Sequence, residues 1–533
     1  MTTANESILA NLIANRASEM PDFDVLTIEG AGVSPDEVRN YRDLWDNGRR
    51  MAQVLQELGV QPGQRFALLM ANHAEFVEAM VAASILGAAV VPIDPRAKGE
   101  KLQFMLDNAQ CSGAFAADYA LENLQPSLSV LPGLRWVMGF ATNEGKCPLS
   151  DYPNVVDWVT VAPKIPPNLQ VLTTDPDSPL ELIFTSGTTG DPKGIVLTNR
   201  RYCDTSLLAK RLFGYRDDDK LYSGLSLTHA NAQVLTLGAA LACKLRCVLS
   251  RRFTKSRLWE ITRKYGATSF TLLGGMTTAV YAELPKPDDA DNPVRFVVSA
   301  GMPAAIWEEF ERRFDVQVLE FYGAAEGGLS FNHPGAGPVG SIGKVAPHLK
   351  HRIVDHLGTE VTRGVSGELL FRHADDQPFV VEYFGNPEAS QAKCAGGWLH
   401  MGDVVHEDEN GWLFFDYRKG NGIRRNGEFI DTAMVEKAIA ESGLVDDVYV
   451  YGIASGNGVP GEKDVVAAVV PKDMAEFDVK RLFEICLGRL DASLQPTYVQ
   501  VMAQIPKTAS EKPQDRFLID AFNRDAHAVH RRI

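Results

Sequence analysis

Near the start of the chain, apolar residues recur at helical spacing and then gather in short continuous runs. From Asp43 to Leu58 they share one helix face, and the sequence GVQPG ends that helix before the strand-like run RFALLMAN. A second helix is predicted over Ala74 to Leu86, directly before the apolar run AAVVPIDP. Helices and strands that alternate in this way predict parallel sheets covered by helices.

The same alternation returns beyond Val294. The run VRFVVSAG predicts a buried strand that leaves the sheet through Gly301, and VQVLEFYGAAEG repeats the pattern further along. Loops at the C-terminal ends of parallel strands are where such sheets bind ligands. We therefore expect an α/β fold with a large N-terminal domain of helix-covered mixed or parallel sheets.

Glycines and basic residues become concentrated around Asp416, in the sequence FFDYRKGNGIRRNGEFID. We predict a domain boundary at Gly420, with an N-terminal domain over residues 1–419 and a smaller, mobile α+β domain over residues 420–533. The apolar pattern of the second domain predicts four elements and then a polar tail: a helix over 433–442, strands over 448–453 and 465–471, and a helix over 479–490.

Composition narrows the function classes. The formal charge of -15 over 533 residues argues against a general binder of nucleic acid or anionic membranes, because both need a basic surface. The seven cysteines are scattered without metal-ligand spacing and are odd in number, which predicts a reduced, cytoplasmic protein. The longest apolar segment, Ala79 to Val91, is too short to span a bilayer, so we expect no membrane span.

The stretch LIFTSGTTGDPKGIVLTN places glycines, hydroxyl side chains and Lys193 between two apolar runs. Glycine lets backbone N–H groups approach a phosphate, hydroxyls supplement them, and a lysine neutralises charge. The spacing is not that of a P-loop, since no Gly-Lys-Ser/Thr triplet occurs at the required distance. A flexible surface hairpin would not account for the lysine, so a loop that handles a triphosphate is preferred.

The ten residues from Thr185 to Gly194 resemble the signature of the adenylate-forming superfamily, which comprises acyl-CoA synthetases, luciferases and peptide-synthetase adenylation domains. Similar motifs follow in the expected order, from YRDLWDNGRRMAQVLQELGVQPG near the start to PKTASEKP near the end. The sequence is most similar to the betaine and medium-chain acyl-CoA ligases. This resemblance implies a two-step reaction, in which a carboxylate and Mg-ATP form acyl-AMP and the thiol of CoA then displaces AMP.

The resemblance also assigns the nucleotide site. Tyr322 would stack on adenine, Asp403 would accept hydrogen bonds from both ribose hydroxyls, and Arg418 would contact ribose or phosphate. The residues expected to bind ATP are Thr185, Ser186, Gly187, Thr188, Thr189, Gly190, Lys193, Ser299, Ala300, Gly301, Glu320, Phe321, Tyr322, Gly323, Ala325, Asp403, Arg418 and Lys512.

Four of the matched residues are expected to be catalytic, namely Thr185, Lys193, Glu326 and Lys512. Glu326, with Thr185, would hold a magnesium ion that bridges ATP phosphates. Lys512 would neutralise the charge that develops as pyrophosphate leaves. The chain departs from the family pattern at four positions: Ala325 replaces Thr or Ser, Tyr417 replaces Asp, and Asn426 and Glu511 each replace Gly.

His229 matches a family position that borders the acyl carboxylate. If the segment THANAQ is extended, alternate polar side chains project to one face and line the acyl pocket. The expected substrate-binding residues are His229, Asn231, Gln233, Gly274, Gly301 and Gly323. A polar wall favours small or polar-substituted acids over palmitate, with aromatic acids as the main competitor.

The resemblance assigns the pantetheine tunnel of CoA to the loop formed by Arg424, Arg425, Asn426, Gly427, Glu428 and Phe429. It also implies that the C-terminal domain rotates about Gly420 between the two half-reactions, so that Lys512 and the tunnel loop serve the active site in turn. The glycine at the hinge is compatible with this rotation, because its backbone is permissive.

Three alternatives stay open: an adenylation enzyme that loads a carrier protein, a luciferase-like oxygenase, and an inactive homologue. We expect no attached carrier module. The matched charged residues are retained, namely Lys193, Glu326, Asp403, Arg418 and Lys512, which favours an active ligase. The expected partners are a small carboxylic acid, ATP and CoA, without nucleic acid, and a homodimer is left open.

Overall fold

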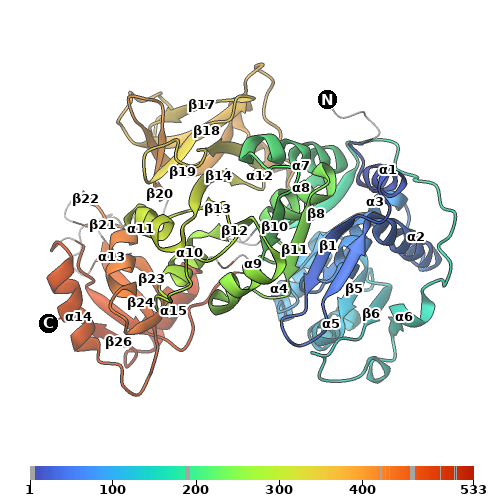
Figure 1. The fold of residues 1–533 in the computed structure, drawn as a ribbon, viewed down its shortest axis with the longest axis horizontal. Coiled ribbons are helices and arrows are strands. Elements are labelled where there is room, and N and C mark those ends of the chain that lie inside the picture. The colour runs from blue at the N-terminus through green and yellow to red at the C-terminus, as the bar shows by residue number, and fades with distance from the viewer. Residues whose placement is uncertain are drawn as a thin grey trace. The chain divides into compact units, whose positions relative to one another are not determined.

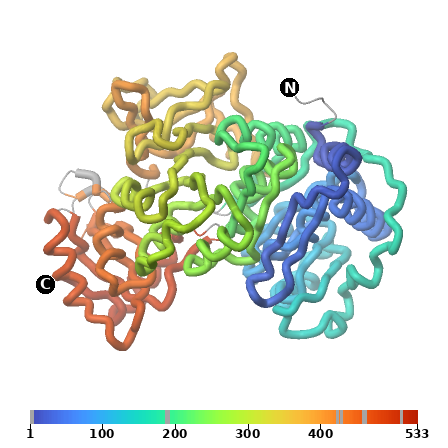
Figure 2. Tube along the Cα trace, in the orientation of Figure 1, coloured from blue at the N-terminus to red at the C-terminus, as the bar shows by residue number. Residues whose placement is uncertain are grey.

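The structure is a computed structural model, shown in Figures 1 and 2, and it describes residues 6–185, 192–419, 423–425, 428–430, 432–455, 463–492, 494–508, 511 and 513–532. The chain divides into two compact units. Unit 1 comprises Met1–Thr254, Glu260–Thr271 and Val381–Ala392, and unit 2 comprises Lys255–Trp259, Leu272–Val380 and Lys393–Ile533. Gly420 lies outside the described residues, so the boundary at that position stays a prediction.

The first sheet of unit 1 contains, within the described residues, strands in the order β7-β6-β5-β3-β4-β8-β9. Neighbouring strands from β7 to β8 run parallel, whereas β9 is antiparallel to β8, so these two strands flank the Thr185 to Lys193 loop. The bounds are β3 Arg65–Leu69, β4 Ala89–Pro92, β5 Cys111–Ala117, β6 Trp136–Phe140, β7 Val155–Asp157, β8 Pro179–Thr185 and β9 Lys193–Thr198.

A second group of strands in unit 1 has the order β12-β10-β11-β1-β2. All of its pairs are parallel except β1 with β2. The bounds are β1 Asp24–Glu29, β2 Glu37–Asn40, β10 Lys220–Ser223, β11 Arg246–Ser250 and β12 Ser269–Leu273, the last of which continues into unit 2.

Two helices of unit 1, α2 (Tyr41–Glu57) and α3 (Ala74–Leu86), confirm the two helices predicted there from the apolar pattern. Helix α3 is buried over almost its whole length and ends at Gly87, whose φ of 70° is in the left-handed region that favours glycine. The bounds are α1 Leu9–Glu19, α2 Tyr41–Glu57, α3 Ala74–Leu86, α4 Gly99–Asn108, α5 Asp118–Val130, α6 Trp158–Val161, α7 Asn199–Phe213, a π-helix Asn231–Gly238 and α8 Ala239–Cys243, with a short 3-10 turn at Leu149–Asp151. The division between the units crosses α9 Leu258–Tyr265 and α12 Pro387–Lys393, and the 3-10 turn Lys255–Arg257 belongs to unit 2.

The larger sheet segment of unit 2 has the order β17-β18-β19-β20-β16-β15-β14-β13. Strands β13 and β14 are parallel, and the pairs from β14 to β17 are antiparallel. The bounds are β13 Phe296–Ala300, β14 Gln317–Ala324, β15 Gly327–Phe331, β16 Ser341–Val345, β17 Leu349–Val354, β18 Gly367–His373, β19 Leu399–Glu407 and β20 Leu413–Arg418, with helices α10 Gly274–Tyr281 and α11 Ala304–Phe314 and a 3-10 turn Ala395–Gly397.

The last part of unit 2 forms a separate α+β core, and one prediction about it is wrong. The four expected elements are present, but the expected polar tail is folded: β25 pairs in parallel with β24, β26 pairs with β25, and α15 buries Leu518. The bounds are β21 Arg424–Arg425, β22 Glu428–Phe429, α13 Thr432–Ala440, β23 Val445–Ala454, β24 Lys463–Pro471, α14 Val479–Arg489, β25 Tyr498–Val501, α15 Asp515–Arg524 and β26 Val529–Arg531. Among the helices of the described residues, none has both the length and the apolar character that a membrane span requires.

Candidate functional site

In unit 2, two of the predicted nucleotide motifs lie near the ends of β13 and β14. Ser299 is buried at the end of β13, Ala300 is partly buried and Gly301 is exposed. On β14, Glu320 and Phe321 are buried, whereas Gly323 is exposed. The parallel pair therefore brings both motifs to one edge of the sheet, as predicted for a ligand-binding edge.

Glu320 holds the loop after β13. Its carboxyl accepts hydrogen bonds from the backbone N–H groups of Gly301 (2.5 Å) and Met302 (3.1 Å). Burial raises the pKa of this carboxyl to about 8, although the two backbone donors act in the opposite direction. The structure thus gives Glu320 a positioning contact with the nucleotide loop, and direct contact of Glu320 with ATP stays a prediction.

The three glycines expected to bind the substrate have backbone reasons to be glycine. A Cβ on Gly274 would lie 2.9 Å from the carbonyl oxygen of Gly301, and a Cβ on Gly323 would lie 2.8 Å from that of Gly328. Gly301 itself has a φ of 98°, which side chains rarely adopt. Close backbone approach is therefore sufficient to explain these residues, and their role in substrate binding stays a prediction.

Tyr322 and Asp403 form the best-defined polar contact of the unit 2 group. The Tyr322 hydroxyl donates a 2.6 Å hydrogen bond to Oδ2 of Asp403. Asp403 is 8% exposed, and Nε of Arg418 lies 3.8 Å from its Oδ1, from the paired position on β20. Burial, followed by the Asp403 charge, holds the pKa of Tyr322 well above its usual range. The Asp403 carboxylate is therefore held in place by the neutral Tyr322 hydroxyl, and the half-exposed guanidinium of Arg418 lies beside it.

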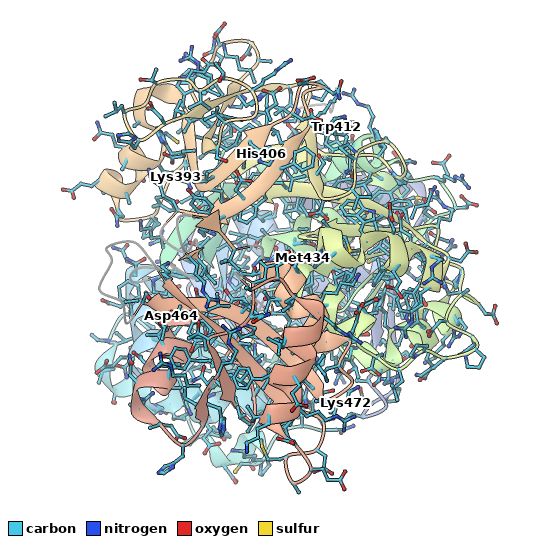
Figure 3. The ribbon with its side chains drawn as sticks, turned by 90° about the vertical axis from the view of Figure 1, so that its left-hand side faces the viewer. Lys393, His406, Trp412, Met434, Asp464 and Lys472 are labelled. Atoms are coloured by element: carbon cyan, nitrogen blue, oxygen red, sulfur yellow. The ribbon has the colours of Figure 1, made fainter. Side chains whose placement is uncertain are left out.

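Lys393, labelled in Figure 3, is a residue that the sequence did not identify. Its ammonium is near enough to Glu326, Asp403 and Arg418 for their charges to affect it, and it donates a 3.4 Å hydrogen bond to the carbonyl of Met401. Burial lowers the pKa of Lys393, the two carboxylates oppose that change, and Arg418 adds to it. No local pattern marks this lysine, because its charged neighbours are distant in the sequence.

Glu326 has the chemistry expected of a magnesium ligand. It is an 8% exposed carboxylate in the turn between β14 and β15. Within the described part of the chain, no group of three or more His, Cys, Asp or Glu side chains has the arrangement of a metal site. Magnesium commonly binds through one or two carboxylates together with substrate phosphates, so a single carboxylate fits an ion that arrives with ATP.

In unit 1, the phosphate loop is described only at its two ends, because residues 186–191 lie outside the described set. Thr185 is paired with Lys193 across the two strands, and its hydroxyl donates a 3.4 Å hydrogen bond to the Lys193 carbonyl. The Lys193 ammonium is 5.3 Å from the ring centre of Tyr383. Sequence reasoning missed Tyr383, which reaches the hairpin through a bridge between Ile195 and its own backbone.

The segment that carries His229, Asn231 and Gln233 is not extended, so the alternation argument for these residues is wrong. Asn231 to Gly238 form a π-helix, in which side chains at i and i+2 do not share a face. Asn231 is 9% exposed, and Gln233 is fully buried with its Nε2 donating a 2.5 Å hydrogen bond to the Leu227 carbonyl. Their roles in substrate binding stay predictions without that support.

The predicted CoA loop is partly described. Arg424–Arg425 and Glu428–Phe429 pair as a short hairpin, and Asn426 and Gly427 lie outside the described residues. Nη1 of Arg425 donates a 2.7 Å hydrogen bond to the carbonyl of Gln495. Lys512 also lies outside the described residues, but the carbonyl oxygen of Glu511, the residue before it, would lie 3.6 Å from a Cβ on Gly275.

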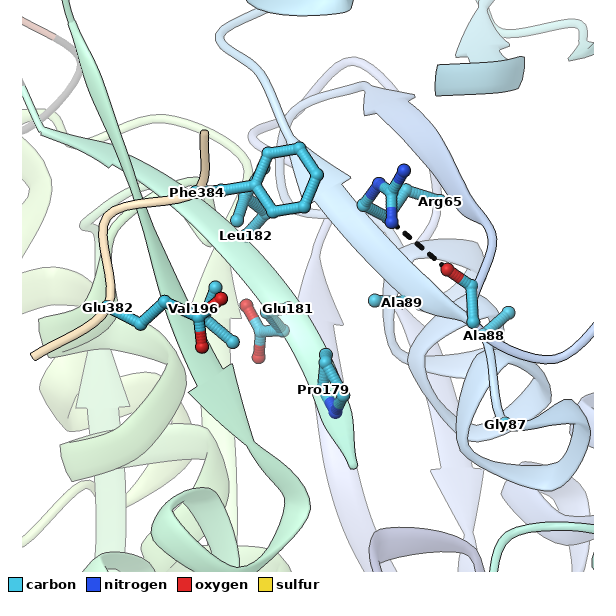
Figure 4. Close-up of a pocket in the computed structure, with 11 residues that line it drawn as sticks. Arg65, Gly87, Ala88, Ala89, Pro179, Glu181, Leu182, Val196, Glu382 and Phe384 are labelled. Atoms are coloured by element: carbon cyan, nitrogen blue, oxygen red, sulfur yellow. Dashed lines mark hydrogen bonds between the residues drawn. The ribbon is translucent and has the colours of Figure 1, made fainter. Parts of the chain in front are cut away.

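A cavity in unit 1 is separate from these groups (Figure 4). Its lining includes none of the predicted site residues and is mostly apolar. Arg65, at this cavity, donates a 3.0 Å hydrogen bond to the Gly63 carbonyl, and its guanidinium lies 4.5 Å from the ring centre of Phe384. The lining residues are Gly63, Arg65, Gly87, Ala88, Ala89, Pro179, Glu181, Leu182, Val196, Glu382 and Phe384.

Comparison with known families gives two matches along the chain. Residues 13–375 match the family described as AMP-binding enzyme, and residues 434–512 match the AMP-binding enzyme C-terminal domain. The medium/long-chain-fatty-acid–CoA ligase FadD17 of Mycobacterium tuberculosis is 29% identical over 489 residues, which is 90% of each chain. The crotonobetaine/carnitine–CoA ligase of Salmonella typhimurium is 25% identical over 493 residues, covering 89% of this chain and 91% of that protein.

Solved structures share the fold. The anthranilate CoA ligase AuaEII in complex with anthranoyl-AMP has a TM-score of 0.82 at 21% identity, over 96% of this chain and 97% of that chain. The o-succinylbenzoate CoA synthetase MenE of Bacillus subtilis, with ATP and magnesium, has a TM-score of 0.76 at 22% identity, over 96% and 99% of the two chains. The mixed α/β architecture expected from the sequence is therefore confirmed.

Proposed function

This chain belongs to the family of AMP-binding enzymes, and on that basis we propose that it is an ATP-dependent acid–CoA ligase. It joins a carboxylic acid to the AMP moiety of ATP with release of pyrophosphate, and then transfers the acyl group to the thiol of CoA with release of AMP. The relatives named above as CoA ligases support this reaction, since they align with about nine tenths of the chain.

The observation that carries the proposal is the contact between Tyr322 and Asp403. Both residues belong to motifs that the family resemblance assigns to the nucleoside, although 80 residues of other sequence lie between them. In the structure they share a 2.6 Å hydrogen bond, with Arg418 across the strand pair. A buried carboxylate held between a hydroxyl and a guanidinium is suited to accept hydrogen bonds from a ribose.

Catalysis in this proposal consists of positioning and charge neutralisation. Asp403 orients the ribose, and Lys193 and the loop before it bind phosphate oxygens. Lys512 neutralises the negative charge that develops when the substrate carboxylate attacks the α-phosphate. The attacking carboxylate is already ionised at neutral pH, so no general base is needed for this step.

Glu326 would hold the magnesium ion, together with ATP phosphates, and Thr185 is the second ligand expected from the resemblance. The ion supplies positive charge against the triphosphate when it is bound. In the second half-reaction, the Arg424 to Phe429 loop would bind the pantetheine arm of CoA after the C-terminal domain has rotated about Gly420. The partly exposed Lys393 contributes additional positive charge beside Glu326 and Asp403.

The first prediction concerns the nucleotide products. With ATP, magnesium, CoA and a suitable acid, we expect AMP and pyrophosphate in equal amounts and one thioester per AMP, because the carboxylate attacks the α-phosphorus of ATP. Chromatography of the nucleotides and mass spectrometry of the thioester measure both. Formation of ADP and phosphate would contradict the adenylate mechanism, whereas acyl-AMP without a thioester would favour the carrier-loading or oxygenase alternatives.

The second prediction concerns the acid. Within the described residues, Oδ1 of Asn231 is buried without a hydrogen-bond partner. Leaving such a group opposite an alkyl chain costs about 1–3 kcal/mol, so we expect kcat/KM to be about tenfold higher for compact or polar-substituted acids than for palmitate. Aromatic acids are the main alternative class of substrate.

A panel of about thirty carboxylates, scored by pyrophosphate release, tests this expectation, and Asn231→Leu is the matched variant. That substitution should raise kcat/KM for apolar acids relative to polar ones, and so reduce the preference for polar acids. Highest kcat/KM for a long unbranched fatty acid in the unmodified protein would overturn the prediction. The preferred acid would then be of the class that the name of the FadD17 relative gives, the medium- and long-chain fatty acids.

A further inference from the structure

Strand β9, which begins at Lys193, has a second partner besides β8. Residues 382–384 run along its other edge and are joined to it by two backbone hydrogen bonds, of 2.8 and 3.0 Å. Between these two bonds, Ile195 of β9 and Tyr383 form an antiparallel bridge. All of these residues belong to unit 1. The segment therefore extends the hairpin that flanks the predicted phosphate loop.

The bridge places the ring of Tyr383 on the same face of the hairpin as Lys193. Side chains two residues apart on a strand share a face, so Lys193 and Ile195 point to the same side. Residues paired across an antiparallel bridge also point to one side, and an aromatic ring can reach the diagonal neighbour of its partner. The distance of 5.3 Å between the Lys193 ammonium and the centre of the Tyr383 ring agrees with this geometry.

Tyr383 is itself held in place by the first turn of α12. It is 5% exposed, and its backbone N–H donates a 2.9 Å hydrogen bond to Oγ of Ser390. Its carbonyl accepts a 3.0 Å hydrogen bond from the N–H of Asn386, whose side chain in turn accepts one of 2.9 Å from the N–H of Ala389. The ring is therefore a fixed surface, whereas the side chain of Lys193 is long, flexible and exposed.

We propose that Tyr383 is a positioning residue that orients the ammonium of Lys193 toward the triphosphate of ATP, an inference that rests on the proposed function. The cation–π attraction holds the ammonium near the ring before ATP binds, so less conformational entropy is lost when the phosphate contact forms. A ring attracts the ammonium without the opposing charge of a carboxylate. The positive charge of Lys193 therefore remains available to the phosphate oxygens.

Tyr383→Leu tests the role of the ring, because leucine keeps an apolar side chain in the bridge and removes the aromatic face. In pyrophosphate release, we expect this substitution to raise KM for ATP about fivefold, as the loss of a cation–π contact does, and to leave KM for the acid within about twofold. Tyr383→Phe keeps the ring, so both values should stay within about twofold of the unmodified protein. An equal rise in KM for ATP in Tyr383→Phe and Tyr383→Leu would overturn the role of the ring.

Two controls separate positioning from general damage. Phe384→Leu removes a ring from the next position of the same segment, where it lies 4.5 Å from the guanidinium of Arg65 at the cavity of Figure 4. This substitution should lower the melting temperature but keep KM for ATP within about twofold. In a Lys193→Met background, Tyr383→Leu should change KM for ATP by less than about 1.5-fold, because the cation that the ring holds is absent. The same rise in both backgrounds would overturn the proposal and indicate a structural role.

Calorimetric titration with MgATP distinguishes this inference from the proposed function, because binding needs no catalysis. The Kd of Tyr383→Leu for MgATP should also rise about fivefold. An active unmodified protein together with an unshifted Kd and KM in Tyr383→Leu would overturn the inference alone. A shifted Kd without pyrophosphate release by the unmodified protein would support the positioning role and refute the proposed ligase. If the unmodified protein does not bind MgATP, both are overturned.

Discussion

Lys512→Ala is expected to reduce acyl-AMP formation by about 10²–10³-fold, because the variant lacks a cation placed against the charge of the departing pyrophosphate. The same variant is expected to convert synthetic acyl-AMP and CoA into thioester at nearly the normal rate. Lys512 would face the reacting atoms only before the C-terminal domain rotates, so the two half-reactions should respond differently. Single-turnover pyrophosphate release measures the first step, and thioester formation measures the second.

The chain just before Lys512 is placed consistently with this role. The backbone of Glu511 passes beside Gly275 at the start of α10, and Gly274 of the same helix is in close contact with Gly301 in the nucleotide loop. At Glu511 the described chain therefore lies beside the predicted nucleotide residues of unit 2. This adjacency is the structural reason to expect the large effect.

Lys507 provides a matched control in the same tail. Its ammonium pairs with Asp447 of β23 over 2.5 Å, within the C-terminal part of unit 2. Lys507→Ala should cost at most about 1 kcal/mol of stability, as a partly exposed ion pair does, and leave both half-reactions within about twofold. Equal loss of the two half-reactions in Lys512→Ala would contradict the domain-rotation model and indicate a structural role.

The elements that could be predicted from the sequence are those with strong local signals. Helix α3 extends over the predicted residues because it is apolar throughout and is followed by a glycine in the left-handed region. Strands β13 and β14 were also visible as apolar runs that end in glycines. In these cases periodicity and termination signals agree with the final fold.

The elements that could not be predicted depend on distant partners. Strand β25 is stabilised by pairing with β24, and α15 buries Leu518. The condition that THANAQ is extended is not met, because short polar alternation also fits a π-helix whose buried amides bond to the backbone, as Gln233 does. The contact of Lys393 with the predicted site likewise depends on tertiary structure.

Glu511 shows how the structure explains a departure from the family pattern. The family usually has glycine at this position, and Glu511 has a φ of 58°, in the left-handed region that glycine adopts without strain. Its N–H donates a 3.0 Å hydrogen bond to the Thr508 carbonyl. A non-glycine residue with this backbone conformation costs on the order of 1 kcal/mol of local stability.

Asp403→Asn is expected to lower kcat/KM for ATP by about 10²-fold or more, because two hydrogen bonds from the ribose to a charged acceptor contribute about 1.5–3 kcal/mol each. The amide keeps the shape of the side chain, and its oxygen can still accept a hydrogen bond from the Tyr322 hydroxyl. In the unmodified protein that hydroxyl donates to Asp403 over 2.6 Å. The fold should therefore persist. Near-normal ATP kinetics in this variant would exclude Asp403 from the nucleoside site.

The same residue pair allows the ribose contact to be separated from general damage. Tyr322→Phe removes the hydroxyl that orients Asp403 but keeps the ring expected to stack on adenine, so its loss in kcat/KM should be within about tenfold. The unmodified protein should prefer ATP over 2′-deoxy-ATP by about tenfold or more, since the deoxy sugar lacks a donor to the carboxylate. In Asp403→Asn this preference should shrink to about threefold or less, because the charge that distinguished the two nucleotides is absent. If Asp403→Asn keeps the full preference while losing activity, the ribose is bound elsewhere and Asp403 acts only through Tyr322 and Arg418.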